Sequence, residues 1–253
     1  MSVNREIWKL HFEQKSFPGL PCPHCVAGKL KLISDSFCIE EPAFSEAYHS
    51  HNDFEPDWVE NRFSARLKCD ESDCGEIVAM VGDTEIVQVE IDEPNFQGWG
   101  LDSVLSPRAV FPGPPLFRIP KNVPFLVAQQ LRLAFQLFWS DIPACAGRLR
   151  TAVELMLDQQ KVSAEKLTKK GKLERMNLAE RIEAFAATAA GDDLKDPLHA
   201  LRQIGNLGAH GTVVTTEALF DAADVLEDVL LGIYEKKSLK AKVKKLTDTK
   251  GDY

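Results

Sequence analysis

The sequence lacks the long apolar runs that a membrane span or a secretory signal requires. Its best candidate, residues 123–139, is interrupted by Gln129, Gln130, Arg132 and Gln136, whereas a spanning helix needs about 20 consecutive apolar residues. The opening residues, MSVNREIW, contain no stretch of the signal-peptide type. The sequence therefore predicts a cytoplasmic protein without a membrane partner. In that compartment its six cysteines are thiols or metal ligands rather than disulfides.

Basic residues are scarce in one part of the chain. Between residues 35 and 93 there are 17 acidic side chains and three basic ones, Arg62, Arg66 and Lys68, which leaves a net charge of −14. Residues 236–250, in contrast, contain seven lysines. Because an acidic segment repels phosphate backbones, any nucleic acid is expected to bind the C-terminal half only.

No internal repeat divides the chain, and its clearest boundary is a run of prolines. Residues 107–124 hold six of the 14 prolines. Proline fixes φ and removes a backbone donor, so we predict an extended linker without helix or central strand. Before it, residues 29–33 and 63–68 have strand patterns. Residues 76–80 and 85–91 predict a hairpin with its turn at Gly82-Asp83-Thr84, and the acidic residues 40–60 predict an insertion loop.

Beyond residue 124 the apolar residues recur at helical spacing. The first helix is expected at 125–138, and Asp141-Ile142-Pro143 opens the second. A lysine-rich hinge follows at 169–172, after which Asn177 and Glu180 form a capping box for the third helix. Asp196 caps a fourth helix that ends near residue 210, and the last begins near Thr216. Helices joined by short connections predict a bundle.

The whole pattern predicts an α+β protein with four parts. A zinc-ribbon-like, β-rich domain with an acidic insertion occupies residues 1–106, and the proline-rich linker occupies 107–124. A bundle of about five helices occupies 125–235, and a lysine-rich tail occupies 236–253.

Four of the cysteines form two pairs, each followed by a glycine. Cys22 and Cys25 precede Gly28, and Cys69 and Cys74 precede Gly75. In a zinc ribbon each pair occupies a tight turn, and the two turns meet in a tetrahedral thiolate site. We therefore predict one structural zinc ion per chain, held by Cys22, Cys25, Cys69 and Cys74 and closed to water. The alternative is two unrelated pairs of reduced cysteines.

Other thiols and imidazoles are assigned lesser roles. His24 is expected to be a bystander within the first pair, and His49 or His51 is an alternative ligand in place of one cysteine. We expect Cys38 to be a small buried apolar residue. Cys145 lies in the first turn of a helix, where the dipole lowers a thiol pKa, but it has no histidine beside it in sequence.

The most distinctive segment is LRQIGNLGAHG at residues 201–211. On a helix, Arg202, Asn206 and His210 share one side. Gly205 and Gly208 are poor helix formers, so they predict the close approach of another backbone or a ligand. A second polar row, Arg150, Glu154 and Asp158, has the same spacing on an earlier helix. One interpretation is a polar network of Arg150, Glu154, Arg202 and His210 that determines the register of the bundle.

Two runs resemble the family called domain of unknown function 4145 (DUF4145). They are GRLRTAVELML at 147–157 and the Leu201-Arg202-x-x-Gly205-Asn206-x-x-Ala209-His210-Gly211 pattern. The resemblance covers about residues 107–234. It implies a bacterial protein. Some members of the family are fused to restriction and phage-defence enzymes or are encoded beside them. A weaker similarity is to HEPN domains, helical bundles of which many are metal-independent ribonucleases with an arginine and a histidine on one helix.

Three functions follow from these patterns. The first is a non-catalytic interaction module of a restriction or phage-defence system, which docks a protein partner through the bundle and the acidic ribbon. The second is a HEPN-like endoribonuclease, in which His210 acts as general base or acid, Arg202 stabilises phosphate charge, Asn206 orients it, and a homodimer pairs two such faces. The third is nucleic-acid binding through the tail and the lysines of the hinge, which are Lys166, Lys169, Lys170 and Lys172.

Overall fold

The fold is α+β, as predicted, and it divides into two compact units. The computed structural model describes residues 3–13, 16–93, 96–209, 213–236 and 246–248. One unit comprises residues 4–114, and the other comprises the chain from Pro115 onward together with Val3. His210 and most of the lysine-rich tail lie outside the described residues.

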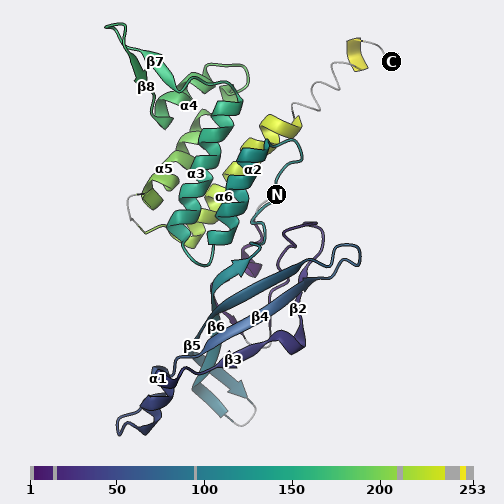
Figure 1. The fold of residues 1–253 in the computed structure, drawn as a ribbon, viewed down its shortest axis with the longest axis vertical. Helices are drawn as coiled ribbons and strands as arrows, with labels where there is room; N and C mark the ends of the chain where they lie inside the picture. Colours follow the sequence, from purple (N-terminus) through teal and green to yellow (C-terminus); the bar gives the residue numbers. More distant parts are fainter. Residues whose placement is uncertain (1–2, 14–15, 94–95, 210–212, 237–245, 249–253) are drawn as a thin grey trace. The chain divides into compact units, whose positions relative to one another are not determined.

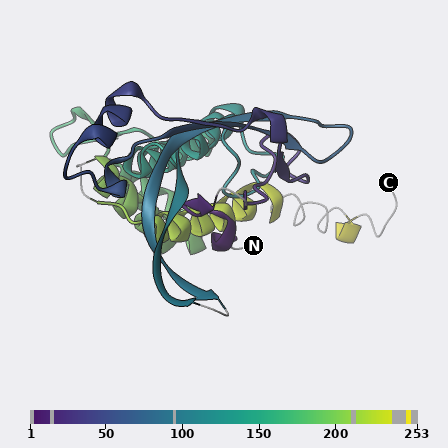
Figure 2. The same ribbon diagram turned by 90° about the horizontal axis from the view of Figure 1, so that it is seen from below.

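The first unit is a six-stranded antiparallel sheet (Figure 1). The strand order is β1-β6-β5-β4-β2, and β3 also pairs with β4. The sheet curls into an open half-barrel (Figure 2). Its strands are β1 (Phe12–Glu13), β2 (Leu30–Leu32), β3 (Cys38–Glu40), β4 (Arg62–Cys69), β5 (Ile77–Glu93) and β6 (Phe96–Phe111).

The core of the sheet lies on one face of its central strands. Alternate residues of β4 are buried, beginning with Phe63. Ala65 lies opposite Met80 and Leu67 lies opposite Val78, and all four side chains are buried. Because side chains alternate across a strand, this register directs the apolar set of both strands to the same side.

The predicted turn at Gly82-Asp83-Thr84 is wrong, because β5 runs through these residues without interruption. Gly82 lies opposite Pro107 beside an irregularity in the ladder. A Cβ atom on Gly82 would lie 2.2 Å from the backbone oxygen of Ser106. The glycine therefore permits the close approach of two strands at a β-bulge rather than the reversal of the chain.

The prediction of a strand-free segment at 107–124 is also wrong for its first five residues. Strand β6 continues to Phe111, and Pro107 lies opposite Gly82 where the register shifts, a bulge position at which a strand tolerates proline. Residues 112–124 contain neither helix nor strand. Within this segment Phe117 is buried edge-on against Phe135, with ring centroids 5.3 Å apart, so the connector packs on the first long helix.

The acidic insertion, residues 40–60, is not entirely loop. It contains the short helix α1 (Ala43–Glu46), a four-residue 3₁₀ turn at Ala47–Ser50 and a three-residue 3₁₀ turn at Pro56–Trp58. Helix α1 lies at one end of its sheet (dark blue in Figure 1). Pro42 precedes the helix in extended conformation, in keeping with the tolerance of proline at helix starts.

The second unit is a helical bundle. In the described residues its long helices number about five, as predicted: α2 (Phe125–Leu137), α3 (Ile142–Gln159), α4 (Leu178–Ala186), α5 (Lys195–Ala209) and α6 (Thr216–Leu230), which continues as a π-helical turn at Leu231–Lys236. Their core includes Phe138, which stacks on Phe220 at 5.7 Å between ring centroids.

Local capping explains where two of these helices begin. The Asp141 side chain accepts a hydrogen bond from the backbone N–H of Ala144 at 2.8 Å and opens α3. Asn177 and Glu180 form the predicted reciprocal capping box of α4. Helix α5, in contrast, begins at Lys195, so Asp196 lies inside its first turn and is not its N-cap as predicted.

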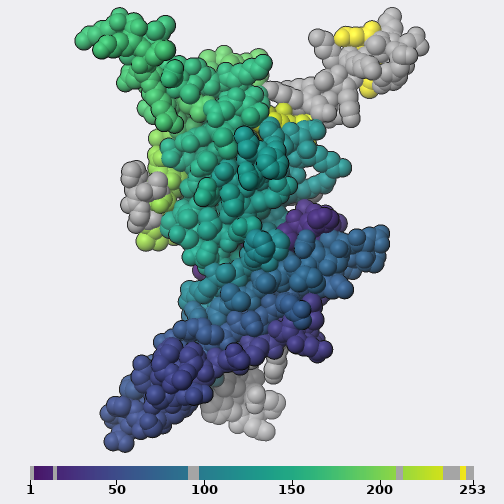
Figure 3. All heavy atoms as spheres, in the orientation of Figure 1, coloured from purple at the N-terminus to yellow at the C-terminus, as the bar shows by residue number. Residues whose placement is uncertain are grey.

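The lysine-rich hinge is a hairpin. Strands β7 (Glu165–Leu167) and β8 (Leu173–Arg175) pair antiparallel, and the turn between them places Gly171 at φ 72°, a conformation that glycine adopts without strain. The hairpin stands out from the helical unit (Figure 3). No helix in the described part of the chain is long and apolar enough to cross a membrane.

Candidate functional site

The four predicted zinc ligands come together in the sheet unit. The Sγ atoms of Cys22, Cys25, Cys69 and Cys74 all lie within 4.8 Å of one another. The Cys22–Cys74 pair is separated by 3.7 Å and the Cys25–Cys69 pair by 3.6 Å. Bonds of about 2.3 Å from a tetrahedral zinc ion to four sulfurs would place the sulfurs about 3.8 Å apart. The cluster thus has the size and donor set of a structural zinc site.

Strand pairing brings the two cysteine pairs to the same place. Leu30 at the start of β2 lies opposite Cys69 at the end of β4, so the turn before β2 meets the turn after β4. Each turn is closed by backbone hydrogen bonds, from Val26 N–H to the Cys22 oxygen and from Cys74 N–H to the Glu71 oxygen. Gly75 follows the second turn with φ 57°, the left-handed conformation that favours glycine.

Backbone donors and burial set the chemistry of the thiols. The Gly28 N–H donates to Cys25 Sγ at 3.3 Å and lowers the pKa of the Cys25 thiol to about 7. Burial raises the pKa of the Cys69 thiol to about 12. Since thiolates are the species that bind zinc, the cluster offers one favoured thiolate near neutral pH, and metal binding must displace protons from the rest.

Gly28 is required by the geometry of the cluster. A Cβ atom at this position would lie 2.4 Å from Cys69 Sγ and 2.8 Å from Glu71 Cγ. We predict that Gly28→Ala displaces the Cys69 ligand and weakens zinc binding by at least about tenfold, as changes to residues that hold metal ligands in place do. Competition with a chromophoric chelator measures this. Gly19→Ala is the control, because its new Cβ meets only the flexible Lys29 side chain, and equal zinc affinity of the two variants would contradict the prediction.

The other cysteines and histidines differ in part from expectation. His49 contacts Glu41 at 2.9 Å and His51 lies near Asp53, so neither belongs to the cluster. His24 is not one of the four ligands, although its Nδ1 lies 3.5 Å from Cys74 Sγ. Cys38 is exposed, not buried, since β3 presents it to solvent.

The expected effect of the helix dipole on Cys145 is not seen. Its thiol is fully buried in α3, and burial, with a smaller contribution from the Asp141 carboxylate, raises its pKa to about 12. Desolvation of the thiolate outweighs the dipole, so this thiol is unreactive at neutral pH.

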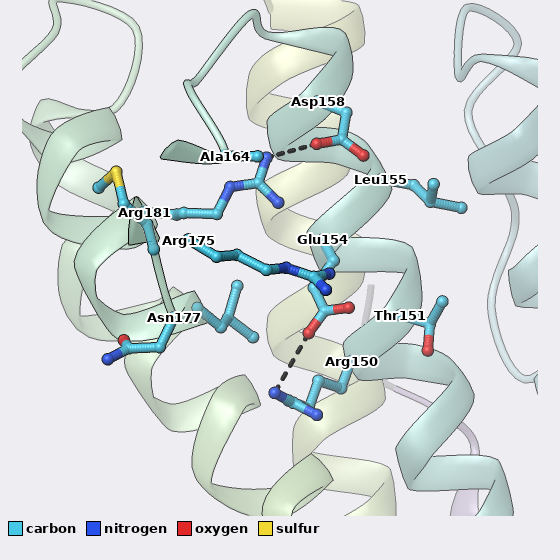
Figure 4. Close-up of a pocket in the computed structure, with 11 residues that line it drawn as sticks. Arg150, Thr151, Glu154, Leu155, Asp158, Ala164, Arg175, Asn177 and Arg181 are labelled. Carbon is cyan, nitrogen blue, oxygen red and sulfur yellow. Dashed lines mark hydrogen bonds and ion pairs between the residues drawn. The ribbon is translucent and has the colours of Figure 1, made fainter. Parts of the chain in front are cut away.

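A second site is a pocket in the helical unit, between α3 and α4 (Figure 4). It has a volume of about 590 Å³. Helix α3 contributes the polar row Arg150, Glu154 and Asp158 with Thr151 and Leu155, and the other wall comprises Ala164, Arg175, Met176, Asn177, Leu178 and Arg181. The i, i+4, i+8 spacing on α3 thus places one whole polar row on a single pocket wall.

Two ion pairs cross or line this pocket. Arg150 contacts Glu154 one turn along α3, at 3.2 Å between Nη2 and Oε1. Arg181 on α4 reaches Asp158 on α3 at 2.5 Å and also donates to the Val162 oxygen. Arg181 is only 7% exposed, so its charge needs this partner. The pair joins the two helices across the end of the pocket.

Helix α5 packs against α3 at its two glycines. A Cβ on Gly205 would lie 2.4 Å from Arg150 Cβ, and one on Gly208 would lie 2.3 Å from the Pro143 oxygen. The predicted close approach at these glycines is therefore that of a neighbouring helix. Glu154 pairs with Arg150 rather than with Arg202, and Arg202 Nε is buried without a hydrogen-bond partner among the described residues. His210 lies outside those residues.

Sequence reasoning missed Arg175 and Arg181. Each directly follows a glutamate in a short segment, and neither stands at a spacing that points to α3. The available signal for Arg181 is its place in the capped helix: it follows Leu178 by three residues and precedes Phe185 by four, so it lies on the apolar face of α4. A charged residue on an apolar helix face predicts a buried partner.

Two family models match the chain, one for each unit. Residues 10–108 match domain of unknown function DUF8608, and residues 132–249 match domain of unknown function DUF4145. The resemblance to DUF4145 is thus confirmed for the helical part. No curated protein and no solved structure matches the chain.

Proposed function

We propose that this protein is a non-catalytic, zinc-containing interaction module that docks a partner protein with a basic surface. We place it, by its DUF4145 resemblance, as an accessory component of a bacterial restriction or phage-defence system. The observation that carries the proposal is the acidic insertion, where large aromatic side chains are exposed among carboxylates.

The aromatic residues of the insertion form a surface suited to protein contact. Phe44 is 51% exposed, Tyr48 42% and Trp58 36%. Tyr48 and Trp58 contact edge-to-face at 5.9 Å between ring centroids, so their rings are held in place before any partner arrives. Exposed aromatic residues are enriched at the centres of protein interfaces, and rigid ones lose little entropy on binding.

The surroundings of these rings determine the kind of partner. A shallow depression beside α1 is lined by Glu40, Glu41 and Glu46 together with Arg62. Arg62 is already paired with Glu60 at 3.0 Å and with Asp83 at 3.3 Å, and Glu41 contacts His49. Within the described residues, this leaves Glu40 and Glu46 without an ion pair. A basic patch on the partner complements this surface and accelerates association.

The zinc site supports a structural role rather than a catalytic one. Four cysteine ligands fill a tetrahedral site and leave no position for water or substrate. The metal would therefore hold the sheet together while the insertion projects from it, and the helical bundle supplies a second docking surface.

The test is binding of the zinc-loaded protein to the purified products of the genes beside its own, measured by calorimetry. We expect Trp58→Ala to weaken the association at least about tenfold, as loss of an interface hot spot does. Trp99→Ala is the matched control, since Trp99 is an exposed tryptophan of the same unit. Added salt should slow association.

Two results would overturn the proposal. One is the absence of association with every neighbouring gene product. The other is chelator-insensitive RNA cleavage by the purified protein that is lost in His210→Ala, which would establish the ribonuclease alternative instead.

A further inference from the structure

We propose that the pocket between α3 and α4 binds a phosphate-bearing small molecule of mononucleotide size. This inference is independent of the docking function proposed above, because it concerns a different unit and different residues. Five observations carry it: the charge of the pocket, the availability of Arg175, the start of α4, the unpartnered Nε atoms of two buried arginine side chains, and the mixed lining of the walls.

The charge of the pocket is unbalanced. Its lining contains three guanidinium groups, from Arg150, Arg175 and Arg181, but only two carboxylates, from Glu154 and Asp158. Each carboxylate is already paired with one arginine, Glu154 with Arg150 and Asp158 with Arg181. One positive charge remains over, so the pocket favours an anion.

Arg175 supplies that charge. Its side chain extends from the end of β8 toward α3, and its guanidinium lies between those of Arg150 and Arg181 (Figure 4). Arg175 is exposed, and within the described residues it has no ion pair or hydrogen bond from its side chain. A guanidinium presents donors in a planar fork that fits two phosphate oxygens at once.

The start of α4 adds backbone donors. Asn177 and Leu178, at the first turn of this nine-residue helix, line the pocket. The capping box uses the Glu180 N–H, which leaves the N–H groups of Leu178 and Ala179 without helical partners. The Glu180 carboxylate forms an ion pair with Lys166, which neutralises its charge. A helix N-terminus with free N–H groups favours phosphate.

A buried, incompletely bonded arginine lies at the same place. Arg181 is 7% exposed, and its Nε has no hydrogen-bond partner among the described residues. Arg150 Nε is in the same condition. Both guanidinium groups therefore retain donor capacity that the two carboxylates do not satisfy, and a bound anion would relieve it.

The size and lining of the pocket define the rest of the ligand. A volume of about 590 Å³ falls in the range of small-molecule sites. Leu155, Met176 and Leu178 form apolar wall beside the arginines, and this suits a flat base. Glu154 can accept hydrogen bonds from sugar hydroxyls or an exocyclic amine. A nucleoside monophosphate combines these groups, whereas inorganic phosphate uses only the cationic part.

The experiment is isothermal titration calorimetry of the full-length, zinc-loaded protein with AMP, inorganic phosphate and adenosine. We expect AMP to bind more tightly than either inorganic phosphate or adenosine. Arg175→Ala should weaken AMP binding about tenfold or more, since it removes charge-assisted hydrogen bonds. Arg175→Lys should give an intermediate affinity, because it retains the charge but not the fork.

Arg148→Ala is the matched control. Arg148 is an exposed arginine of α3 that donates to Gln130 and does not line the pocket, so its loss should leave AMP affinity unchanged. Thermal unfolding of each variant verifies that it is folded. We expect Arg175→Ala to keep the wild-type melting temperature, because Arg175 is exposed. The proposal fails if AMP does not bind at millimolar concentration, if adenosine or inorganic phosphate binds as tightly as AMP, or if Arg148→Ala weakens binding as much as Arg175→Ala.

Discussion

Cys69→Ser is expected to abolish zinc binding and to unfold the sheet unit. Cys69 is buried at the end of β4, its N–H donates to the Glu76 oxygen at 2.9 Å, and its Sγ lies 3.6 Å from Cys25 Sγ. The ligands come from two turns more than 40 residues apart, 22–25 and 69–74. A metal held by both therefore crosslinks the turn before β2 to the turn between β4 and β5.

The size of the effect follows from the coupling of metal binding to folding. Structural zinc contributes about 10–16 kcal/mol of apparent binding free energy in small zinc domains at neutral pH, which exceeds the stability of most single domains. Serine cannot replace the thiolate, so zinc held by the remaining three cysteines would contribute little of this binding free energy. We expect zinc content near zero in Cys69→Ser and a lost or strongly lowered thermal transition of the sheet unit.

Cys38→Ser is the control for this experiment. Cys38 is exposed and does not belong to the cluster, so its variant should retain one zinc per chain and the wild-type melting temperature. Treating the wild-type protein with a chelator should reproduce the Cys69→Ser result and should be reversed by added zinc. A Cys69→Ser protein that keeps both its zinc and its melting temperature would refute the assignment of the site.

Gly208→Ala is expected to have the largest effect on the helical unit. The new Cβ would lie 2.3 Å from the backbone oxygen of Pro143, and a backbone atom cannot move aside as a flexible side chain can. The start of α3 and the end of α5 must therefore separate. Overpacking of this kind costs about 1–3 kcal/mol and occasionally more, which exceeds the roughly 1 kcal/mol that alanine gains over glycine within a helix.

Gly147→Ala separates this contact effect from helix propensity. Gly147 lies inside α3, and its added Cβ would meet nothing within 4 Å. This variant should be as stable as the wild type or more stable by up to about 1 kcal/mol. Urea unfolding followed by circular dichroism at the helical band measures the free energy of unfolding of both variants. If Gly208→Ala proves as stable as Gly147→Ala, α3 and α5 do not pack through this glycine.

Features that depend on neighbouring residues could be predicted without the structure. Asp141 and Asn177 begin α3 and α4 because their side chains satisfy free N–H groups within three residues. The two cysteine pairs predict a metal site because the type and the spacing of the residues indicate which metal they can bind. The number of long helices follows from apolar periodicity, which is also a local property.

Strand pairing, in contrast, depends on residues that are distant in the chain. Gly82 permits a turn or a bulge, and nothing within a few residues distinguishes them. The choice depends on Pro107 and Ser106, 24 or more residues later in the chain, which lie opposite it in β6. For the same reason Pro107 could be placed in a strand only once its partner was known, since proline is excluded from a ladder only where a donor is needed.

The two sites divide in the same way. Cys22, Cys25, Cys69 and Cys74 were readable from sequence, whereas the pocket of Arg150, Arg175 and Arg181 was not. Its residues come from α3, α4 and the end of β8, and only packing shows which guanidinium finds a carboxylate and which is left over. Local patterns determine secondary-structure elements and the types of metal ligand. The net charge of a pocket depends on side chains from distant segments, so it is known only once those segments have packed together.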